Sequence, residues 1–400
     1  MLNDAQRAAL NEIERQVSLI RISDQPCPSN VIPVVGNLQK AIDDAPEWAI
    51  LDLLGNTFVE AVVVNKPLNL RNGTIQAPPN CNDVVILRES HIVLNGGLII
   101  NGDGTTKRGI MNDAMFVEID NIQVRNIRRA GQESQAIAMW NTPGPLKVTN
   151  SVLEAGSIPF LAGGNPPVIP NTIATGLLFE NCLFTRPVAW QGQAIVCKNA
   201  FELKSAQDVV VRNCTLENVW KQGQTASAIV LTAVNYGNSP DAVVQNVLFE
   251  NCNIRNVGAG VNGIGYGQHT NDAGQVTPTR QGNNWKFINC NWEISMARNG
   301  GTGALVMLGR EPKDIHFDGG VCVQDGGAFL RQTEPMVPIN DFSLQNMTIK
   351  PVGTYGVFTP IGSRGVGWNT AFPGGVIAGN TLYGAHSLFK TNFPNNTYAV

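Results

Sequence analysis

Glu202 and Lys204 stand two residues apart in the segment AFELK and bring an acid and a base to one short stretch of chain. Side chains at positions i and i+2 of a strand point to the same side. A carboxyl group beside an ammonium group there could serve as general acid and base on a saccharide, in a hydrolase or a lyase. A satisfied ion pair under a loop is the alternative interpretation, and it is the one that we favour.

The longest insertions in the chain hold a second set of candidates, because loops on a rigid scaffold commonly carry function. In the loop over 258–284, His269, Asp272 and Arg280 combine a base, a carboxylate and a cation. Aromatic faces bury apolar area at little entropic cost, so rings in such loops suit the binding of sugars. The candidate glycan-binding residues are Trp140, Trp190, Trp220, Tyr236 and Tyr266. Packing within the loops is the alternative for all five.

A third candidate is His316 with Asp318, two positions apart on what we expect to be an outward strand face. A histidine beside a carboxylate is a common base with its orienting group. A solvated surface pair is the interpretation that we favour. On the same expected face, Glu180, Arg212 and Glu250 fall on three successive coils, and opposite charges on neighbouring strands stabilise the pairing by roughly 0.2–1 kcal/mol each.

Composition and motifs exclude several classes of function. The chain has a net charge of −3 and no basic run, so we expect no nucleic-acid partner. No apolar run approaches the ~18 residues of a membrane-spanning helix. No CxxC pair occurs, and the GxGxxG match at 258–263 does not stand between a strand and a helix, so we expect neither a metal nor a nucleotide cofactor.

These residues are positioned by a short phrase that returns along the chain. In its strong copies an apolar residue stands two positions before an Asn, a Cys follows the Asn, and another apolar residue comes two positions later. The strong copies are LFENCLF at 178–184, VVRNCTL at 210–216, LFENCNI at 248–254 and KFINCNW at 286–292. Weaker copies at 147–153, 316–322 and 343–349 extend the series, with intervals of 27 to 38 residues. Such a period indicates a solenoid.

Each phrase predicts two short strands joined by a corner. Its residues alternate between apolar and polar, which is the period of a strand. Asn tolerates the left-handed backbone conformation that a sharp corner requires. We therefore predict an all-β fold, a single parallel β-helix with one coil for each copy of the phrase.

A second strand, starting with Ala, precedes each phrase. These strands lie at 136–140, 200–204, 228–232, 304–308 and 328–332. The inward residues that we expect to stack, about 4.8 Å apart, are Phe201, Ile229, Leu305 and Phe329. The outward positions of these strands are mostly apolar, with Glu202 and Lys204 as the exception. An apolar outer face needs a cover, either long loops or a neighbouring subunit.

The sequence predicts a first helix over residues 4–20. Its apolar stripe, with heptad spacing, consists of Leu10, Ile13, Val17 and Ile20. We interpret residues 1–25 as a trimeric coiled coil or docking segment, or else as an amphipathic helix that lies on the body.

A second, shorter helix is predicted over 36–45, in the segment GNLQKAIDDA. It resembles the opening of pectate-lyase-like β-helices, where a short helix caps the first coil, because an open solenoid end exposes sheet edges and apolar interior. The expected organisation is an N-terminal helix in 1–25, a capping segment in 26–60 and a β-helix in 61–400.

Cysteine recurs at the corner of the phrase. Four of the eight cysteines, Cys182, Cys214, Cys252 and Cys290, occupy equivalent positions of successive coils. Parallel stacking points their side chains the same way, which fits disulfide geometry poorly. We expect a column of buried free thiols that pack as small apolar residues.

Residues 200–385 resemble uncharacterised bacterial right-handed β-helix proteins of the pectate-lyase-like superfamily. The phrases that carry the resemblance are AFELKSAQDVVVRNCTLENVW, GQTASAIVLTAVN, VGAGVNGIG, TYGVF and GVGWNTAFPGGVIAGNTLYGA. The resemblance implies a right-handed solenoid and brings no catalytic residues. In architecture the chain is also similar to phage tailspike β-helices, a likeness that does not by itself carry function.

We therefore expect a structural and receptor- or glycan-binding protein, a homotrimeric spike or fibre component at the virion surface. Its partners would be a cell-surface polysaccharide and, through the N-terminal helix, other virion proteins. The alternative is a polysaccharide lyase or glycoside hydrolase of the pectate-lyase-like superfamily, and a third reading is an extracellular binding module. The opening residues lack the pattern of a secretory signal, which favours the first.

Overall fold

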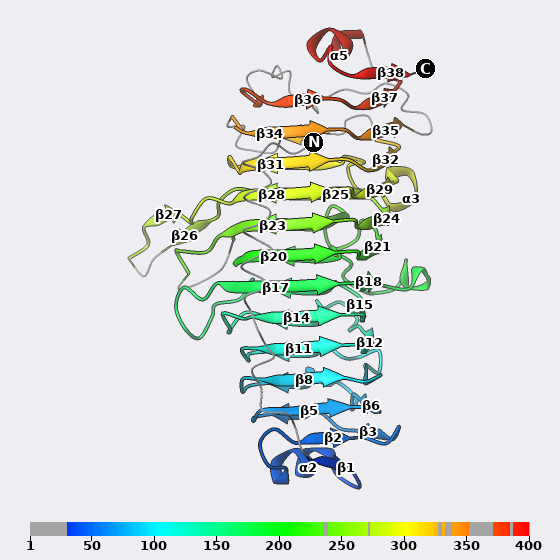
Figure 1. Cartoon of the computed structure of the whole chain (residues 1–400), viewed down its shortest axis with the longest axis vertical. Helices are drawn as coiled ribbons and strands as arrows, with labels where there is room; N and C mark the ends of the chain where they lie inside the picture. The colour runs from blue at the N-terminus through cyan, green and yellow to red at the C-terminus, as the bar shows by residue number, and fades with distance from the viewer. Residues whose placement is uncertain are drawn as a thin grey trace.

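The chain is a right-handed parallel β-helix, as the repeat and the resemblance predict. The computed structural model describes residues 30–234, 239–270, 273–326, 330–332, 338–351, 371–384 and 387–399, so the helix predicted over 4–20 lies outside it. Three long parallel sheets, here called A, B and C, run the length of the solenoid (Figure 1).

Sheet A and sheet B meet at the Asn corner of each coil. Within the described residues, sheet A consists of β1 (Val31–Pro33), β2 (Ile50–Asp52), β5 (Leu68–Arg71), β8 (Ile92–Asn95), β11 (Val117–Asp120), β14 (Leu146–Thr149), β17 (Ala174–Glu180), β20 (Ala206–Arg212), β23 (Val244–Glu250), β28 (Asn283–Ile288), β31 (Lys313–Asp318), β34 (Phe342–Gln345) and β36 (Val376–Ala378). Sheet B consists of β3 (Thr57–Val59), β6 (Thr74–Gln76), β9 (Ile99–Asn101), β12 (Gln123–Ile127), β15 (Val152–Ala155), β18 (Leu183–Thr185), β21 (Thr215–Val219), β24 (Asn253–Val257), β29 (Asn291–Ile294), β32 (Val321–Gln324), β35 (Thr348–Pro351), β37 (Thr381–Tyr383) and β38 (Thr397–Ala399).

Sheet C holds the strands that we expected to start with Ala. Over the same described ranges it consists of β4 (Val62–Val64), β7 (Asp83–Leu87), β10 (Arg108–Asn112), β13 (Gln135–Met139), β16 (Ile158–Ala162), β19 (Phe201–Leu203), β22 (Ser227–Thr232), β25 (Ala259–Ile264), β30 (Val306–Gly309) and β33 (Leu330–Gln332). Outside the three sheets lie an antiparallel hairpin, β26 (Gln268–Thr270) with β27 (Val276–Pro278), and the helices α2 (Leu38–Asp44), α3 (Met296–Asn299) and α5 (Ser387–Asn392).

The Asn corners adopt the predicted left-handed conformation. Asn181, Asn213, Asn251 and Asn289 have φ of 56°, 54°, 53° and 52°. Two further columns of left-handed residues went unnoticed in the sequence. One lies within sheet A and consists of Asp208, Asn246, Asn284 and Asp314; the other lies within sheet B and consists of Asn126, Asn218 and Asn256. Each coil therefore bends at more places than the phrase alone indicated.

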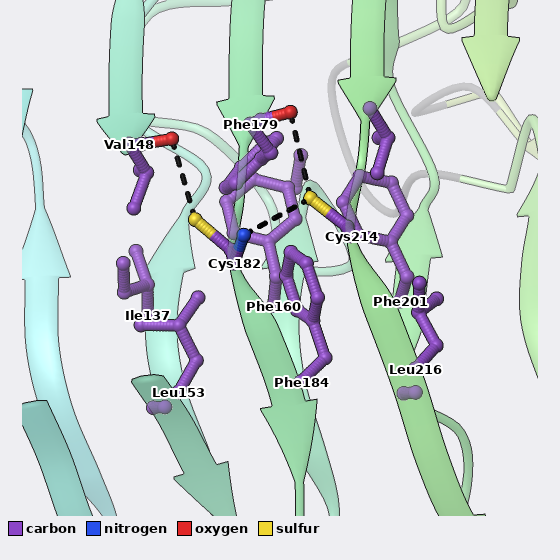
Figure 2. Packing of buried hydrophobic residues seen from close by; sticks show 14 of the residues in the cluster. Ile137, Val148, Leu153, Phe160, Phe179, Cys182, Phe184, Phe201, Cys214 and Leu216 are labelled. Carbon is purple, nitrogen blue, oxygen red and sulfur yellow. Dashed lines mark hydrogen bonds between the residues drawn. The ribbon is translucent and has the colours of Figure 1, made fainter. Parts of the chain in front are cut away.

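The interior of the solenoid is a column of aromatic and apolar side chains. Phe160, Phe179 and Phe201 contact one another with ring centroids 4.5–5.4 Å apart. Figure 2 shows Cys182 and Cys214 on successive coils of this interior. The amide N–H of Cys182 donates to the sulfur of Cys214 at 3.3 Å. The column of free, buried thiols is confirmed for the described cysteines, while Cys27 lies outside them.

The predicted register of sheet C is wrong in its later coils. Phe201 pairs with Ile229 as expected, but the next residues in this column are Val261, Val306 and Leu330. Leu305 therefore stands one position before the column, and Phe329 lies outside the described residues. The alternation pattern failed there because Leu305 and Val306 are both buried, at 0% and 1% exposure.

The apolar outer face of sheet C is already covered within the single chain. Its outward residues Met111, Leu161, Val230 and Met307 are only 5–6% exposed. Of the two covers that we considered, a neighbouring subunit is therefore not required for these residues.

The helix predicted over 36–45 is confirmed as α2, at the end of the solenoid (Figure 1). The side chain of Asn37 accepts the amide N–H of Lys40 at 2.7 Å, and the carboxylate of Glu60 accepts that of Leu38 at 2.7 Å. Both contacts satisfy amides that a helix N-terminus leaves without partners. Leu38 and Ile42 are fully buried and join the core, so α2 closes the apolar interior at this end. None of the helices in the described ranges is long and apolar enough to span a membrane.

Candidate functional site

A candidate site in the described part is an open cleft beside the β26–β27 hairpin, which projects from the side of the solenoid (Figure 1). Its volume is about 500 Å³, within the range of small-molecule sites. The cleft is lined by Tyr266, Gln268, Val276, Pro278, Thr279, Gln281 and Glu311. Three separate segments meet there: the hairpin, the chain that leads into β28, and the turn between β30 and β31.

Thr279 fixes the base of the hairpin to the body of the solenoid. Its side chain is 6% exposed, accepts the amide N–H of Gly267 at 2.7 Å and donates to the carbonyl of Ala233 at 2.9 Å. A buried hydroxyl with both functions satisfied holds its neighbours in one arrangement. The position of Tyr266, beside Gly267, is therefore set by the framework.

The turn between β30 and β31 is held in an unusual conformation. Arg310 and Glu311 are consecutive residues with φ of 53° and 54°. Residues other than Gly, Asn and Asp rarely adopt this region, and such strain tends to collect at functional sites. Arg310 lies over the Tyr266 ring, 6.0 Å from its centroid, and donates to the carbonyl of Tyr266 at 3.4 Å. The amide of Gln281 donates to the carbonyl of Glu311. The strained turn thus brings the carboxylate of Glu311 to the cleft and places Arg310 against Tyr266.

The predicted trio of the loop is not brought together at the cleft. His269 is 9% exposed on β26, where it pairs with Thr277, and Arg280 is exposed, but neither lines the cleft. Asp272 lies outside the described residues. Sequence reasoning found Tyr266 but missed Gln268, Gln281 and Glu311, because no local pattern shows which loops fold against one another.

Glu202 and Lys204 form an ion pair, with 3.1 Å between the ammonium and a carboxylate oxygen. Glu202 is fully buried, and its second carboxylate oxygen accepts the amide of Asn199 at 2.8 Å. Its neighbours in register on the outer face are the apolar Leu161 and Val230. The geometry shows the ion pair that we favoured from the sequence, although the carboxylate oxygen of Glu202 that faces Lys204 is buried without a hydrogen-bond donor of good geometry.

The candidate tryptophans each contact an arginine. Arg108 lies 5.3 Å from the ring of Trp140, Arg128 lies 4.7 Å from Trp190, and Arg186 lies 5.8 Å from Trp220. Trp190 and Trp220 are only 6% and 3% exposed. Tyr236 lies outside the described residues. Among the five aromatic candidates, Tyr266 is the one that lines the described cleft.

The predicted pairing of His316 with Asp318 is corrected by the structure. The imidazole of His316 contacts Asp314 through Nε2 and Ser343 through Nδ1. Asp314 is two residues before the histidine, at one of the left-handed positions, so it also reaches the histidine's side of the strand.

The expected row of Glu180, Arg212 and Glu250 is in register, and Arg212 pairs with Glu250 at 2.8 Å.

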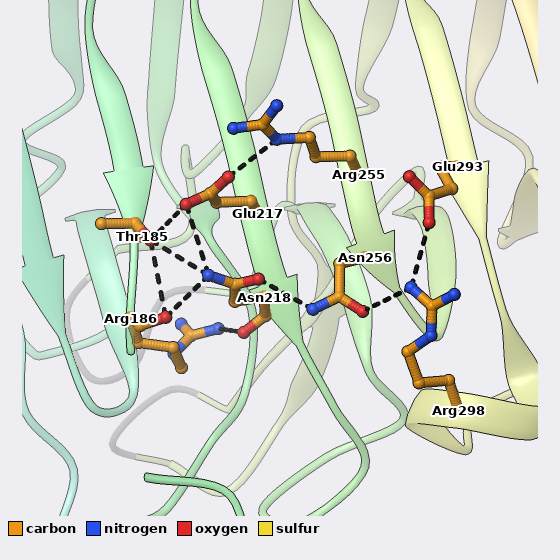
Figure 3. Close-up of polar contacts among 8 residues, drawn as sticks. All are labelled: Thr185, Arg186, Glu217, Asn218, Arg255, Asn256, Glu293 and Arg298. Carbon is orange, nitrogen blue, oxygen red and sulfur yellow. Dashed lines mark hydrogen bonds and ion pairs between the residues drawn. The ribbon is translucent and has the colours of Figure 1, made fainter. Parts of the chain in front are cut away.

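Sheet B presents a second, smaller groove of about 440 Å³, lined by residues of β24, β29 and β32. Figure 3 shows charged side chains in and beside this groove, where Glu217 pairs with Arg255 at 2.8 Å and Glu293 with Arg298 at 3.1 Å. Asn256 accepts a hydrogen bond from Arg298 at 3.3 Å. Because these four charges neutralise one another in pairs, the arrangement is suited to stabilising the coils. Over the described ranges, no cluster of three or more His, Cys, Asp or Glu side chains could hold a metal ion.

No protein-family model matches the chain. No protein of curated function matches its sequence. Among solved structures, an alginate lyase from Paenibacillus sp. matches with 12% identity over 90% of this chain and 100% of the other, at a TM-score of 0.47. The A-module of the mannuronan C-5 epimerase AlgE4 from Azotobacter vinelandii matches with 14% identity over 90% and 99%, also at 0.47. Tailspike protein 3 of bacteriophage CBA120 matches with 13% identity over 87% of this chain and 54% of the other, at 0.45.

Proposed function

We propose that this protein binds a saccharide chain through the cleft beside the β26–β27 hairpin. The observation that carries the proposal is the composition of the cleft. It joins the partly exposed ring of Tyr266 to the amides of Gln268 and Gln281 and the carboxylate of Glu311. A ring packs against the apolar face of a sugar, while amides and carboxylates bind its hydroxyl groups.

The number of carboxyl groups in the cleft fits a protein that binds a glycan without cleaving it better than it fits a hydrolase. Glycosidases of both stereochemical outcomes use two carboxyl groups on either side of the scissile bond. The described lining of the cleft has one, Glu311. The other early candidate, Glu202, is fully buried in an ion pair. We therefore infer that the protein holds a glycan, and that neutral sugars fit best because Glu311 would repel uronate carboxylates.

The biological setting that we propose is a receptor-binding spike or fibre component. In this role the chain would form a homotrimer at the virion surface, bind a cell-surface polysaccharide and dock to other virion proteins through residues 1–25. The heptad stripe of Leu10, Ile13, Val17 and Ile20 supports the trimer. An extracellular glycan-binding module is the alternative setting, with the same cleft.

The test is calorimetric titration of the full chain with a panel of neutral and uronate-containing bacterial surface polysaccharides. We expect a neutral glycan to bind, and Tyr266→Ala to weaken its binding about tenfold or more, since a ring contact is worth roughly 1–2 kcal/mol. The matched control is Tyr383→Ala, because Tyr383 lies under a cation, Lys350, at 5.4 Å but outside the cleft. This control should leave the affinity unchanged.

Two results would overturn the proposal. One is binding that persists unchanged in Tyr266→Ala. The other is release of new reducing ends or unsaturated uronates from the bound polysaccharide, because cleavage would favour the lyase or hydrolase reading.

A further inference from the structure

Three side chains on the outer face of sheet A meet in the order of a hydrolytic relay. Nδ1 of His316 lies 2.6 Å from the hydroxyl oxygen of Ser343, and Nε2 contacts a carboxylate oxygen of Asp314. His316 and Ser343 stand in register on the neighbouring strands β31 and β34. Both are 6% exposed, whereas the side chain of Asp314 is 41% exposed. Nucleophile, base and orienting carboxylate are thus within direct contact of one another.

The carboxylate determines which nitrogen of His316 carries the proton. Asp314 can only accept, so Nε2 is the protonated nitrogen of the neutral ring. Nδ1 is then the acceptor in the contact with Ser343, and the hydroxyl of Ser343 donates to it. Burial acts to raise the pKa of Asp314, but its hydrogen bond to His316 and the nearby positive charge of Lys286 hold the pKa below its usual value. Asp314 therefore stays ionised and keeps the imidazole in the tautomer of a general base.

The residues on either side of the relay complete a site. Lys286 stands in register with His316 on β28 and is 1% exposed. On the other side Val376, in register with Ser343 on β36, is 43% exposed. The buried Lys286 thus lies at one end of this row and the partly exposed side chain of Val376 at the other.

We propose that Ser343, His316 and Asp314 hydrolyse small carboxylic esters, such as acyl groups carried on a sugar hydroxyl. Ser343 attacks the ester carbonyl carbon, and its proton passes to Nδ1 of His316. The bond between the carbonyl carbon and the alcohol oxygen breaks, and the alcohol leaves with that proton. A water molecule, deprotonated by His316, then attacks the acyl-serine, the carboxylic acid departs, and the proton returns to Ser343. Lys286, on the other side of His316, helps to keep Asp314 ionised, and the acyl group rests on Val376.

The experiment uses the full chain with two probes, a fluorophosphonate and p-nitrophenyl acetate. The fluorophosphonate should label Ser343, located by peptide mass mapping. Ser343→Ala and His316→Gln should each slow hydrolysis of p-nitrophenyl acetate about 100-fold or more. Asp314 is a positioning residue, so Asp314→Asn should lower kcat with little change in KM, and Asp314→Glu should recover part of the loss.

The matched control is Thr348→Ala, which removes a hydroxyl from the same coil but on sheet B. It should leave both labelling and hydrolysis unchanged. The proposal is overturned if the native chain is not labelled at Ser343, or if folded Ser343→Ala hydrolyses the ester at the native rate. Labelling of the native chain decides the matter even where a variant fails to fold.

Discussion

At the scale of single residues, Arg186 shows how polar groups are accommodated between the coils. Its side chain is fully buried, and it donates to the carbonyls of Ala155, Ser157, Asn199 and Asn218 at 2.6–3.2 Å. These carbonyls come from several coils and from the loop that follows β18. The guanidinium therefore ties together backbone segments that would otherwise leave buried carbonyls without donors.

Replacing Arg186 should lower the free energy of unfolding substantially. We expect Arg186→Met to lower it by about 2–4 kcal/mol, because several buried carbonyls lose charged donors. Arg186→Lys should recover only part of the lost free energy of unfolding, because an ammonium group cannot reproduce the planar array of donors of a guanidinium. Urea unfolding followed by circular dichroism measures the difference. Arg298→Met is the control, because Arg298 is 60% exposed and should change stability little. Equal effects in both variants would contradict this account.

Asp52 should make stability depend on pH at the N-terminal end. The amide N–H of Leu54 and the side chain of Asn72, with help from Arg71, hold the pKa of Asp52 below its usual value. A lowered folded-state pKa adds stability above the unfolded pKa of about 3.9, and that stability is lost as pH falls through the folded pKa. Asp52→Asn should therefore melt below the native chain at pH 7, with the difference shrinking below about pH 4.

Thermal melts between about pH 3 and 7 test this dependence. Asp44→Asn is the matched control, because Asp44 pairs with Lys40 on the surface of α2 with its side chain 64% exposed. A gap between Asp52→Asn and the native chain that stays constant with pH would rule out the carboxylate as its source.

At the scale of elements, the sequence predicts the corners far better than the registers. The Asn of the phrase identified the bends between sheets A and B at Asn181, Asn213, Asn251 and Asn289, because few residue types tolerate positive φ. The second bend had a comparable signal that was overlooked: RNI at 125–127, ENV at 217–219 and RNV at 255–257 place Asn126, Asn218 and Asn256 in the same local pattern. Register in sheet C failed for a different reason, since neighbouring residues such as Leu305 and Val306 are both buried.

The corner conformation gives a sharp test at Asn251, which has φ of 53°. Asn251→Val should lower the free energy of unfolding by about 1–2 kcal/mol, because a β-branched residue is strained in this conformation. Asn251→Gly removes the same side chain without that strain and should be nearly neutral. Urea unfolding of both variants measures the contrast. Equal losses would show that the Asn side chain, and not its backbone, stabilises the corner.

At the scale of the whole molecule, the fold followed from the repeat but the cleft did not. Tyr266 and Arg310 meet across 44 residues of sequence, through the pairing of a hairpin and a strained turn that no repeated phrase marks. His316 and Ser343, by contrast, are the first residues of two weak copies of the phrase, and they lie in register on neighbouring coils although they are 27 residues apart. In a solenoid, residues one coil apart regularly become neighbours. Only the correct register of the strands shows which side chains contact one another.

The oligomeric state is the property that we predict for the whole molecule. The outer face of sheet C no longer argues for a partner subunit, because its apolar residues are buried within one chain. The trimer therefore rests on residues 1–25 alone, whose heptad stripe is about two heptads long and marginal by itself. We expect light scattering to give three times the chain mass for the full protein, and a lower mass at micromolar concentration once residues 1–25 are removed. A monomer in both cases would contradict the proposed spike and favour the extracellular binding module. A trimer that survives truncation would instead place the subunit contacts on the solenoid, where the Tyr266 cleft could be shared between neighbouring chains.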